Sequence, residues 1–173
     1  IGWLSCHIGN LTVNTSNIEG SIGGEDIQSV FGRHEDEEML DFKPGAFTAE
    51  LHVPKYAWTK MNVMMQSMLA SITYGNATQQ SSTPAAPGPT LLVKRGDHSN
   101  PCTTIATMYS TFLVMKKFKR TSARIVWLDG HARSNLDSVW TSLFGSDIHH
   151  VKELTPNEVL NDVIVVNTMT AFG

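Results

Sequence analysis

The sequence predicts an α/β fold with a Rossmann-like parallel sheet, and two features of its carboxyl-terminal half carry this prediction. From Thr90 onward, short apolar runs alternate with longer segments of helical periodicity, which is typical of parallel α/β units. Polar residues directly follow two of the apolar runs, as in sheets that bind ligands at the carboxyl ends of their strands. A chain of 173 residues with 41% apolar and 17% charged residues also fits a globular class.

The amino-terminal part, residues 1–89, is predicted to be an irregular segment with a single helix. An amphipathic helix is expected over about residues 54–74, because Pro54 suits a first helical turn and apolar residues recur at spacings of three and four. We expect its methionine-rich face to point into the core. Residues 75–89 are rich in Pro, Ser and Gly and predict a surface loop. The apolar positions of the helix are Ala57, Trp58, Met61, Met64, Met65, Met68, Leu69 and Ile72.

Residues 90–173 are predicted to form the Rossmann-like unit. Strands are expected at 90–95, 125–128, 148–151 and 163–166. A helix starts at Asn100-Pro101, and a second one is capped by Ser134 or Asn135. The predicted core-facing positions are Ile105, Met108, Tyr109, Phe112 and Leu113 in the first helix, and Leu136, Val139, Trp140 and Leu143 in the second.

Two groups of polar residues are expected to meet at one edge of this sheet. Asp129, Gly130 and His131 follow one strand, and Asp97 and Asn100 follow the strand before it in the sequence. If the two strands are parallel neighbours, both loops line one polar pocket beside the positive ends of the next helices. An alternative reading makes Asp129 a turn cap and His131 a surface residue. No glycine-rich phosphate loop is present.

Charge and composition narrow the classes of partner. The net charge is −3 and the pI about 6.1, so nucleic acid is not an expected partner. The basic run at 116–120 falls in the last turn of a predicted helix, where it complements the helix dipole. His149 and His150 are neighbours on a predicted strand and point to opposite faces, so no metal site is expected.

Three sequons suggest a secretory compartment. Asn10, Asn14 and Asn76 each precede a non-proline residue and then Thr or Ser, so they are candidate glycosylation sites. Cys6 and Cys102 either pair in an oxidising lumen or are two free, buried thiols.

Several blocks of the sequence resemble the plant N-glycan β-1,2-xylosyltransferases and, more distantly, the group that includes the O-GlcNAc transferase of EGF repeats. The blocks occur in the order of that family and span nearly the whole chain. The resemblance rests on 23–25, 30–33, 35–38 and 45–47, on 90–95 with Asn100, and above all on Ile125-Val126-Trp127-Leu128-Asp129-Gly130-His131, followed by 140–144.

This resemblance implies an inverting Golgi glycosyltransferase with two Rossmann domains (the GT-B type), of which the chain corresponds to the amino-terminal half. It implies a UDP-sugar donor, UDP-xylose, as co-substrate without a further cofactor, and a glycan or glycoprotein as acceptor. A membrane anchor and the rest of a longer polypeptide would lie outside this chain. The absence of an Asp-x-Asp motif agrees with a metal-independent reaction.

The chain departs from the family pattern in one helix. Thr103 and Thr107 stand where the family has a histidine and, four residues later, an aspartate. A helical wheel places both threonines with Asn100, on the side opposite the predicted core face, so they are expected to face the cleft. Threonine cannot act as a general base near neutral pH, and losing such a base costs about 10²–10⁴ in rate.

Three functions are compatible with these observations. The first is part of a glycosyltransferase, with Asp97 and His131 as candidate bases and with Arg95, Asn100, Asp129, Thr103 and Thr107 as candidate substrate-binding residues; this part alone is expected to be inactive. The second is a catalytically inactive relative that serves as a carbohydrate-binding or interaction module. The third is an unrelated single-domain nucleotide-binding protein.

Overall fold

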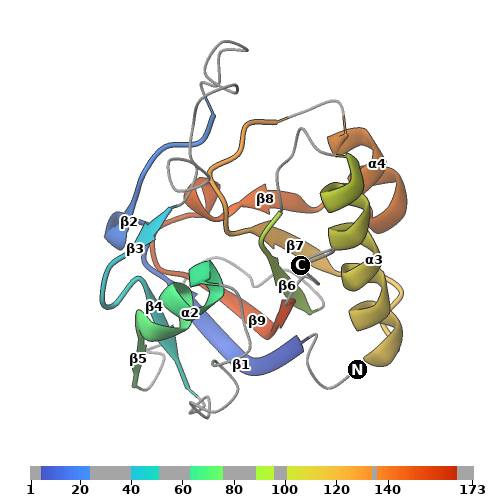
Figure 1. Cartoon of the computed structure of the whole chain (residues 1–173). Helices are drawn as coiled ribbons and strands as arrows, with labels where there is room; N and C mark the ends of the chain where they lie inside the picture. The colour runs from blue at the N-terminus through green and yellow to red at the C-terminus, as the bar shows by residue number, and fades with distance from the viewer. Residues whose placement is uncertain are drawn as a thin grey trace.

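The computed structural model describes residues 5–23, 40–50, 63–75, 89–95, 101–133 and 136–166. It shows an α/β fold on a seven-stranded sheet with the order β5-β4-β1-β9-β6-β7-β8 (Figure 1). The strands of this sheet are β1 (Ser5–Val13), β4 (Phe47–Ala49), β5 (Ile72–Tyr74), β6 (Thr90–Val93), β7 (Arg124–Trp127), β8 (Ile148–His150) and β9 (Glu158–Val166), and β2 (Ile18–Glu19) pairs separately with β3 (Asp41–Phe42).

The predicted parallel unit is confirmed, and one antiparallel strand extends it. Strands β9, β6, β7 and β8 are parallel neighbours, and β4 is parallel to β5. Strand β1 runs antiparallel to β4 on one side and to β9 on the other. The predicted strands shift by one or two residues, and the one expected at 163–166 is the end of the longer β9. Strands β6, β7 and β8 follow one another toward one edge of the sheet. The next strand in the sequence, β9, lies on the other side of β6, so the direction of strand order reverses between β6 and β9.

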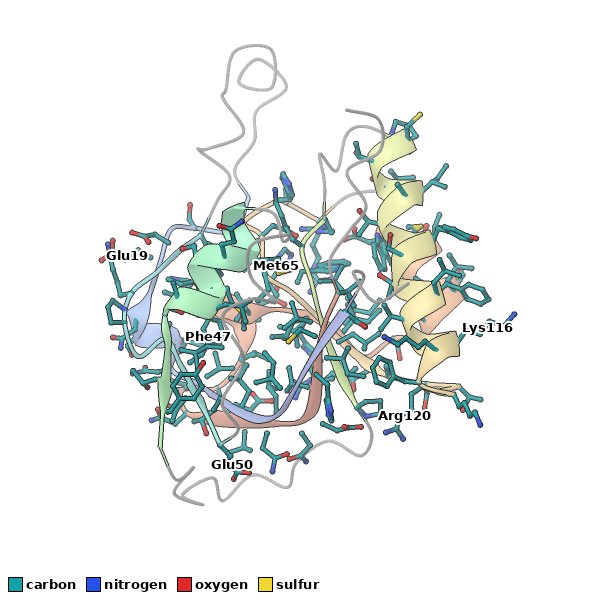
Figure 2. All side chains as sticks on the ribbon, turned by 60° about the horizontal axis from the view of Figure 1, so that its bottom comes forward. Glu19, Phe47, Glu50, Met65, Lys116 and Arg120 are labelled. Carbon is teal, nitrogen blue, oxygen red and sulfur yellow. The ribbon has the colours of Figure 1, made fainter. Side chains whose placement is uncertain are left out.

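The sheet separates two hydrophobic cores. Because side chains alternate along a strand, Leu91 and Val93 of β6 face one core while Leu92 faces the other. The first core contains residues of α3 (Pro101–Lys117) and α4 (Asp137–Phe144), and the second contains α2 (Val63–Ala70) with β1 and β4. In Figure 2, Met65 lies on α2, Phe47 of β4 lies close to that helix, and Lys116 lies on the outer side of α3.

The methionine-rich helix ends earlier than the sequence predicts, and its described residues Met65, Met68 and Leu69 are buried as expected. Met65, Met68 and Leu69 of α2 have no exposed surface, which confirms a core-facing stripe. The chain then leaves the helix, and Ile72–Tyr74 forms β5 beside β4, so the predicted extension of the helix to residue 74 is wrong. β-branched and aromatic residues at 72–74 favour a strand once a partner edge is available. Residues 54–62 of the predicted helix lie outside the described residues, as do residues 76–88 of the predicted loop.

Helix α3 buries only part of the face predicted for it: Met108 is buried and Leu113 packs against the core, but the other three predicted residues are exposed. Ile105, Tyr109 and Phe112 are 64%, 58% and 52% exposed, whereas Thr107 is 2% exposed. The hydroxyl groups of Thr107, Ser110 and Thr111 each donate to the carbonyl oxygen four residues earlier, at 2.9 Å. Large side chains, including Trp127 and Trp140, fill the space between α3, α4 and the sheet. Small hydroxyl side chains can pack beside them at little cost, because each hydroxyl is satisfied within its own helix.

Helix α4 also differs in detail from its prediction. Leu136 occupies the N-cap position, rather than Ser134 or Asn135. Trp140 and Phe144 are buried, whereas Val139 and Leu143 are 41% and 59% exposed. The core face of α4 is therefore narrower than the apolar stripe in its sequence.

None of the helices among the described residues has the length and apolar character needed to cross a bilayer.

The cysteines take no part in a disulfide with one another. Cys6 is half-buried at the start of β1, and Cys102 is exposed in the first turn of α3. Cys6 and Cys102 are therefore not paired with each other in this structure, and neither is a fully buried thiol as the other alternative expects.

Candidate functional site

The candidate site lies where strands β6 and β7 end. These strands are parallel neighbours in register, with Val93 opposite Trp127, so the chain leaves both of them at the same edge of the sheet. A hydrogen bond of 2.9 Å from the Leu128 N–H to the Val93 carbonyl oxygen continues the pairing beyond the strands. Lys94 and Arg95 follow β6, and residues 129–133 follow β7. The prediction that these two loops begin side by side is therefore confirmed.

A buried ion pair between Arg95 and Asp129 joins the two loops. The side chain of Arg95 is 3% exposed and that of Asp129 is fully buried. The Asp129 carboxylate accepts hydrogen bonds from the Arg95 backbone N–H at 2.7 Å and from its Nε and Nη2 atoms at 3.1 and 2.7 Å. It also accepts one from the His131 backbone N–H at 3.2 Å. A single carboxylate therefore fixes the direction of both loops as they leave the sheet.

The guanidinium of Arg95 extends this network to the next turn and to the start of α4. It donates to the carbonyl oxygens of His131 and Ala132 at 2.7 and 3.4 Å, and one nitrogen lies 3.5 Å from the Asp137 carboxylate. The flat face of the guanidinium stacks on Trp127, with 3.9 Å from Cζ to the ring centroid. All of these contacts are within the protein, so Arg95 orders the edge of the sheet rather than presenting its charge to solvent.

Burial and charge shift the pKa values of two groups in this network. Burial alone would raise the pKa of Asp129, but the charges of Arg95 and His131 and the hydrogen bonds from Arg95 outweigh it and lower that pKa. Burial is the largest cause that lowers the pKa of His150, and the positive charge of Arg95 lowers it further. His150 packs edge-on against Trp127, with ring centroids 5.1 Å apart. Asp129 is thus held as a carboxylate and His150 as a neutral imidazole.

A segment far away in sequence is anchored to the same edge. The Gly23 backbone N–H donates to the Gly130 carbonyl oxygen at 3.0 Å. Gly23 has a φ of +65°, and a Cβ at this position would lie 3.1 Å from the Cβ of Ala132. Both the backbone conformation and the close approach to Ala132 favour glycine here. The first residue of the block 23–25 therefore lies beside the loop that follows β7.

Two expectations about exposure are wrong. The sequence predicts that Asp129 lines a polar pocket, but its side chain has no exposed surface, because it neutralises Arg95 inside the protein. We expected Thr107 to face a cleft, but its hydroxyl is buried in α3 and bonded to the Thr103 carbonyl oxygen, while Thr103 itself is half-buried. The alternative in which His131 is a surface residue is also excluded, because that side chain is only 5% exposed.

The remaining predicted residues are placed as follows. Asp97, Asn100 and Asn76 lie outside the described residues. His149 is half-exposed and His150 is fully buried, which confirms that the two histidines face opposite sides of the sheet. Asn10 lies within β1, and Asn14 directly follows it.

The sequence analysis does not single out Arg133, an exposed cation among the described residues of this edge. Arg133 follows the Asp129–His131 turn, and its side chain is 51% exposed. Its guanidinium donates to the Glu153 carboxylate at 2.9 Å and lies 5.6 Å from the Trp127 ring centroid. Lys94, between Val93 and Arg95, is half-buried. Side chains alternate along an extended segment, so Lys94 and Arg95 point to opposite faces, and Arg95 is the more buried of the two. The sequence already contained this signal.

Comparison with known proteins finds two plant relatives. The chain is 27% identical over 181 residues to a β-1,2-xylosyltransferase of rice, Oryza sativa subsp. japonica, covering 89% of this chain and 34% of that protein. It is 27% identical over 184 residues to a β-1,2-xylosyltransferase of Arabidopsis thaliana, covering 87% of this chain and 34% of that protein. No protein-family model and no solved structure gives a significant match. The chain spans about a third of the length of these curated relatives, and over nearly nine-tenths of its own length it is similar to β-1,2-xylosyltransferases.

Proposed function

We propose that the chain is the amino-terminal Rossmann-like part of a glycosyltransferase that moves xylose from UDP-xylose to an N-glycan in the Golgi lumen. The observation that carries this proposal is the similarity to two xylosyltransferases along almost the whole chain, including both strands that lead into the candidate site. The reversal of strand order between β6 and β9 supports it, because open α/β sheets bind ligands at such a reversal.

The proposed reaction needs a base for the acceptor hydroxyl and positive charge for the departing diphosphate. Arg133 is the described cation best placed for the diphosphate, since it is half-exposed at the end of β7. Arg95 acts through Asp129 as a positioning residue, because both groups are buried against each other. His131 stays a candidate base together with Asp97, and the Asp129 carboxylate fixes the backbone of His131.

A transfer assay with a matched pair of variants tests this proposal. The full-length protein is incubated with UDP-xylose and an N-glycan acceptor, and the product is measured by mass spectrometry. Arg133→Gln is expected to lower kcat/KM at least tenfold, because removing one charged donor at a transferred or departing group costs a few kcal/mol. Lys116→Gln removes an equal charge on the outer side of α3 (Figure 2) and is expected to have no effect. Equal activity of the two variants would contradict the role given to Arg133.

The second candidate is an inactive relative that binds glycans or other proteins. Thr103 and Thr107 favour it, because they replace the titratable residues of the family pattern and the Thr107 hydroxyl is used inside the helix. Glycan binding without any transfer, measured with the same acceptor and donor, would support this candidate over the enzyme.

A further inference from the structure

The outward side of α3 is an apolar stripe that carries no charge over most of the helix. Ile105, Tyr109 and Phe112 are each more than half exposed. At about 100° per residue, these positions fall together with Lys116 within about 60° of arc. No residue of α3 before Lys116 is charged. A helix that faces only water normally carries charged residues on its outward side, so this stripe is expected to meet a partner.

Helix α4 widens the apolar surface. Residues of α3 and α4 belong to one hydrophobic core, so the two helices cover the same face of the sheet (Figure 1). Val139 and Leu143 of α4 are exposed on the side away from that core. Of the six large hydrophobic side chains that are exposed among the described residues, five lie on these two helices. An apolar cluster of this kind usually marks an interaction site.

A group of cations lies at one end of this surface. The run from Lys116 to Arg120 holds four of the 13 Lys and Arg residues of a chain whose net charge is −3. All four are exposed, and among the described residues only Arg120 pairs with a carboxylate, that of Asp162. In Figure 2, Lys116 projects from the outer side of α3 and Arg120 lies at its lower end. Lys116, Lys117 and Lys119 are therefore available to an anionic partner.

One of these lysines occupies a backbone position that suits glycine. The Lys119 N–H donates to the Lys116 carbonyl oxygen at 3.1 Å, and the Arg120 N–H donates to that of Met115 at 2.9 Å. This pair of bonds ends a helix at a residue in the left-handed conformation, which is usually glycine. Here that residue is Lys119, with a φ of +53°. The lysine side chain strains the backbone at this point, and the cost to stability favours a role for its charge.

We propose that the outward face of α3 and α4, together with the cations at the end of α3, binds the surface of an anionic membrane. The apolar side chains lie at the level of the lipid headgroups, and the lysines contact the anionic groups of the lipids. The net charge of the chain does not prevent this, because charges farther away than about 10 Å are screened at 0.1 M salt.

A second copy of the chain fits this face less well. In a symmetric dimer each copy offers the same surface, so the lysines of one copy need carboxylates on the same face of the other. Helix α3 contains no acidic residue, and α4 contains only Asp137. The Asp137 carboxylate is mostly buried, 3.5 Å from the Arg95 guanidinium. An anionic lipid surface supplies the missing counter-charge.

Co-sedimentation of the purified 173-residue chain with sucrose-loaded vesicles tests this inference. Vesicles of equal parts phosphatidylcholine and phosphatidylserine provide the anionic surface, and vesicles of phosphatidylcholine alone are the neutral control. We expect the affinity for the anionic vesicles to be at least tenfold higher, because each lysine near such a surface contributes about fivefold. This difference should shrink as the salt concentration rises.

Single substitutions test the role of the cations. Lys116→Gln should lower the affinity for anionic vesicles about fivefold. Lys43→Gln is the matched control, because Lys43 is equally a surface lysine but lies on another part of the molecule, beside Glu19 and Asp41. Lys119→Gly should also weaken binding about fivefold and yet raise the urea midpoint of unfolding, since glycine suits the left-handed backbone. Opposite changes in binding and stability separate the charge from its effect on the fold.

A double variant tests the apolar stripe. Tyr109→Gln combined with Phe112→Gln should lower the affinity at least tenfold, because both side chains lose their apolar contact with the lipids. Tyr74→Gln is the control, since Tyr74 is an exposed aromatic residue of β5, at the other end of the strand order from β8. Circular dichroism without vesicles should be the same for all of these variants, because the substituted side chains are exposed.

Several outcomes would overturn the inference. These are equal binding to the two kinds of vesicle, an equal loss in Lys43→Gln and Lys116→Gln, and full binding by the Tyr109 and Phe112 double variant. A dimer that this double variant dissociates, in a chain that does not bind vesicles, would instead assign the face to a second copy. The assay contains no sugar donor, so its result stands apart from the proposed function: vesicle binding without xylose transfer by the full-length protein contradicts only the latter.

Discussion

Replacing Asp129 by asparagine tests the role of the buried ion pair directly. The substitution keeps the size of the side chain but removes the closest negative charge, so that the buried Arg95 guanidinium retains only the Asp137 carboxylate at 3.5 Å as a counter-charge. The Asp129 carboxylate accepts three hydrogen bonds from Arg95 and one from His131. In Asp129→Asn, one oxygen becomes an NH2 group that faces these donors.

The expected loss is a large part of the total stability. Both side chains are at most 3% exposed, so solvent screening does not reduce the effect. Breaking a buried pair by removing one partner costs about 3–5 kcal/mol, against about 5–15 kcal/mol for the unfolding of a typical domain. With a urea dependence of ~2 kcal/mol per M, the midpoint of unfolding should fall by about 1.5–2.5 M.

Equilibrium unfolding in urea, followed by tryptophan fluorescence and circular dichroism, measures this shift. Asp147→Asn is the matched control, because Asp147 is half-exposed and pairs with Arg124 at 3.6 Å and His149 at 2.8 Å. A surface pair of this kind contributes less than about 1 kcal/mol. If Asp129→Asn shifts the midpoint no further than Asp147→Asn, the pair does not hold the edge of the sheet. Adding Arg95→Met to Asp129→Asn should restore part of the loss, since it removes the buried positive charge.

Three further predictions concern other parts of the structure. Gly23→Ala should lower the free energy of unfolding by more than about 1 kcal/mol, because alanine is strained at a positive φ and its Cβ meets Ala132; Gly75→Ala, at a position without a left-handed backbone and with its nearest neighbouring atom 4.0 Å from the new Cβ, should cost less in the same urea experiment. The lowered pKa of His150 means that below pH ~6.5 the unfolded chain binds a proton that the folded chain does not. Stability should therefore fall as the pH drops from 7 to 5.5, and His150→Phe should flatten this slope. Thr107→Val should change stability by less than about 1 kcal/mol and leave glycan binding and transfer intact, because the lost hydroxyl only contacts Thr103; a folded but inactive variant would instead give Thr107 a direct role.

The parallel part of the fold could be predicted because its strands are buried on both faces. Every residue of β6 is buried, and so are three of the four in β7, so their sequences are continuous apolar runs that stand out between two helices. Strand β1 lacks this signal. Gly9, with a φ of +83°, and Asn10 interrupt its alternation, and its pairing with β9 shifts register on both sides of Gly9. An irregular strand of this kind is defined by its two partners rather than by its own sequence.

The candidate site could be predicted in position but not in the roles of its residues. The order of strands and loops brings Arg95 and Asp129 to one edge, and this follows from topology. The sequence does not show that the two side chains would neutralise each other and become buried, which leaves the exposed charge to Arg133. Helical periodicity likewise placed Met108 and Leu113 of α3 on the core side, but the buried face also includes Thr107 and Thr111, which the apolar pattern does not mark.

The outward stripe of α3 has a practical consequence for handling this protein. Ile105, Tyr109 and Phe112 follow one another at helical spacing and are each more than half exposed. They add little to the free energy of folding, since water still reaches them, but they make concentrated solutions prone to self-association that salt strengthens. Lysine or glutamine at these three positions should therefore yield a chain that folds as before and stays dispersed at the concentrations that crystallisation and NMR require.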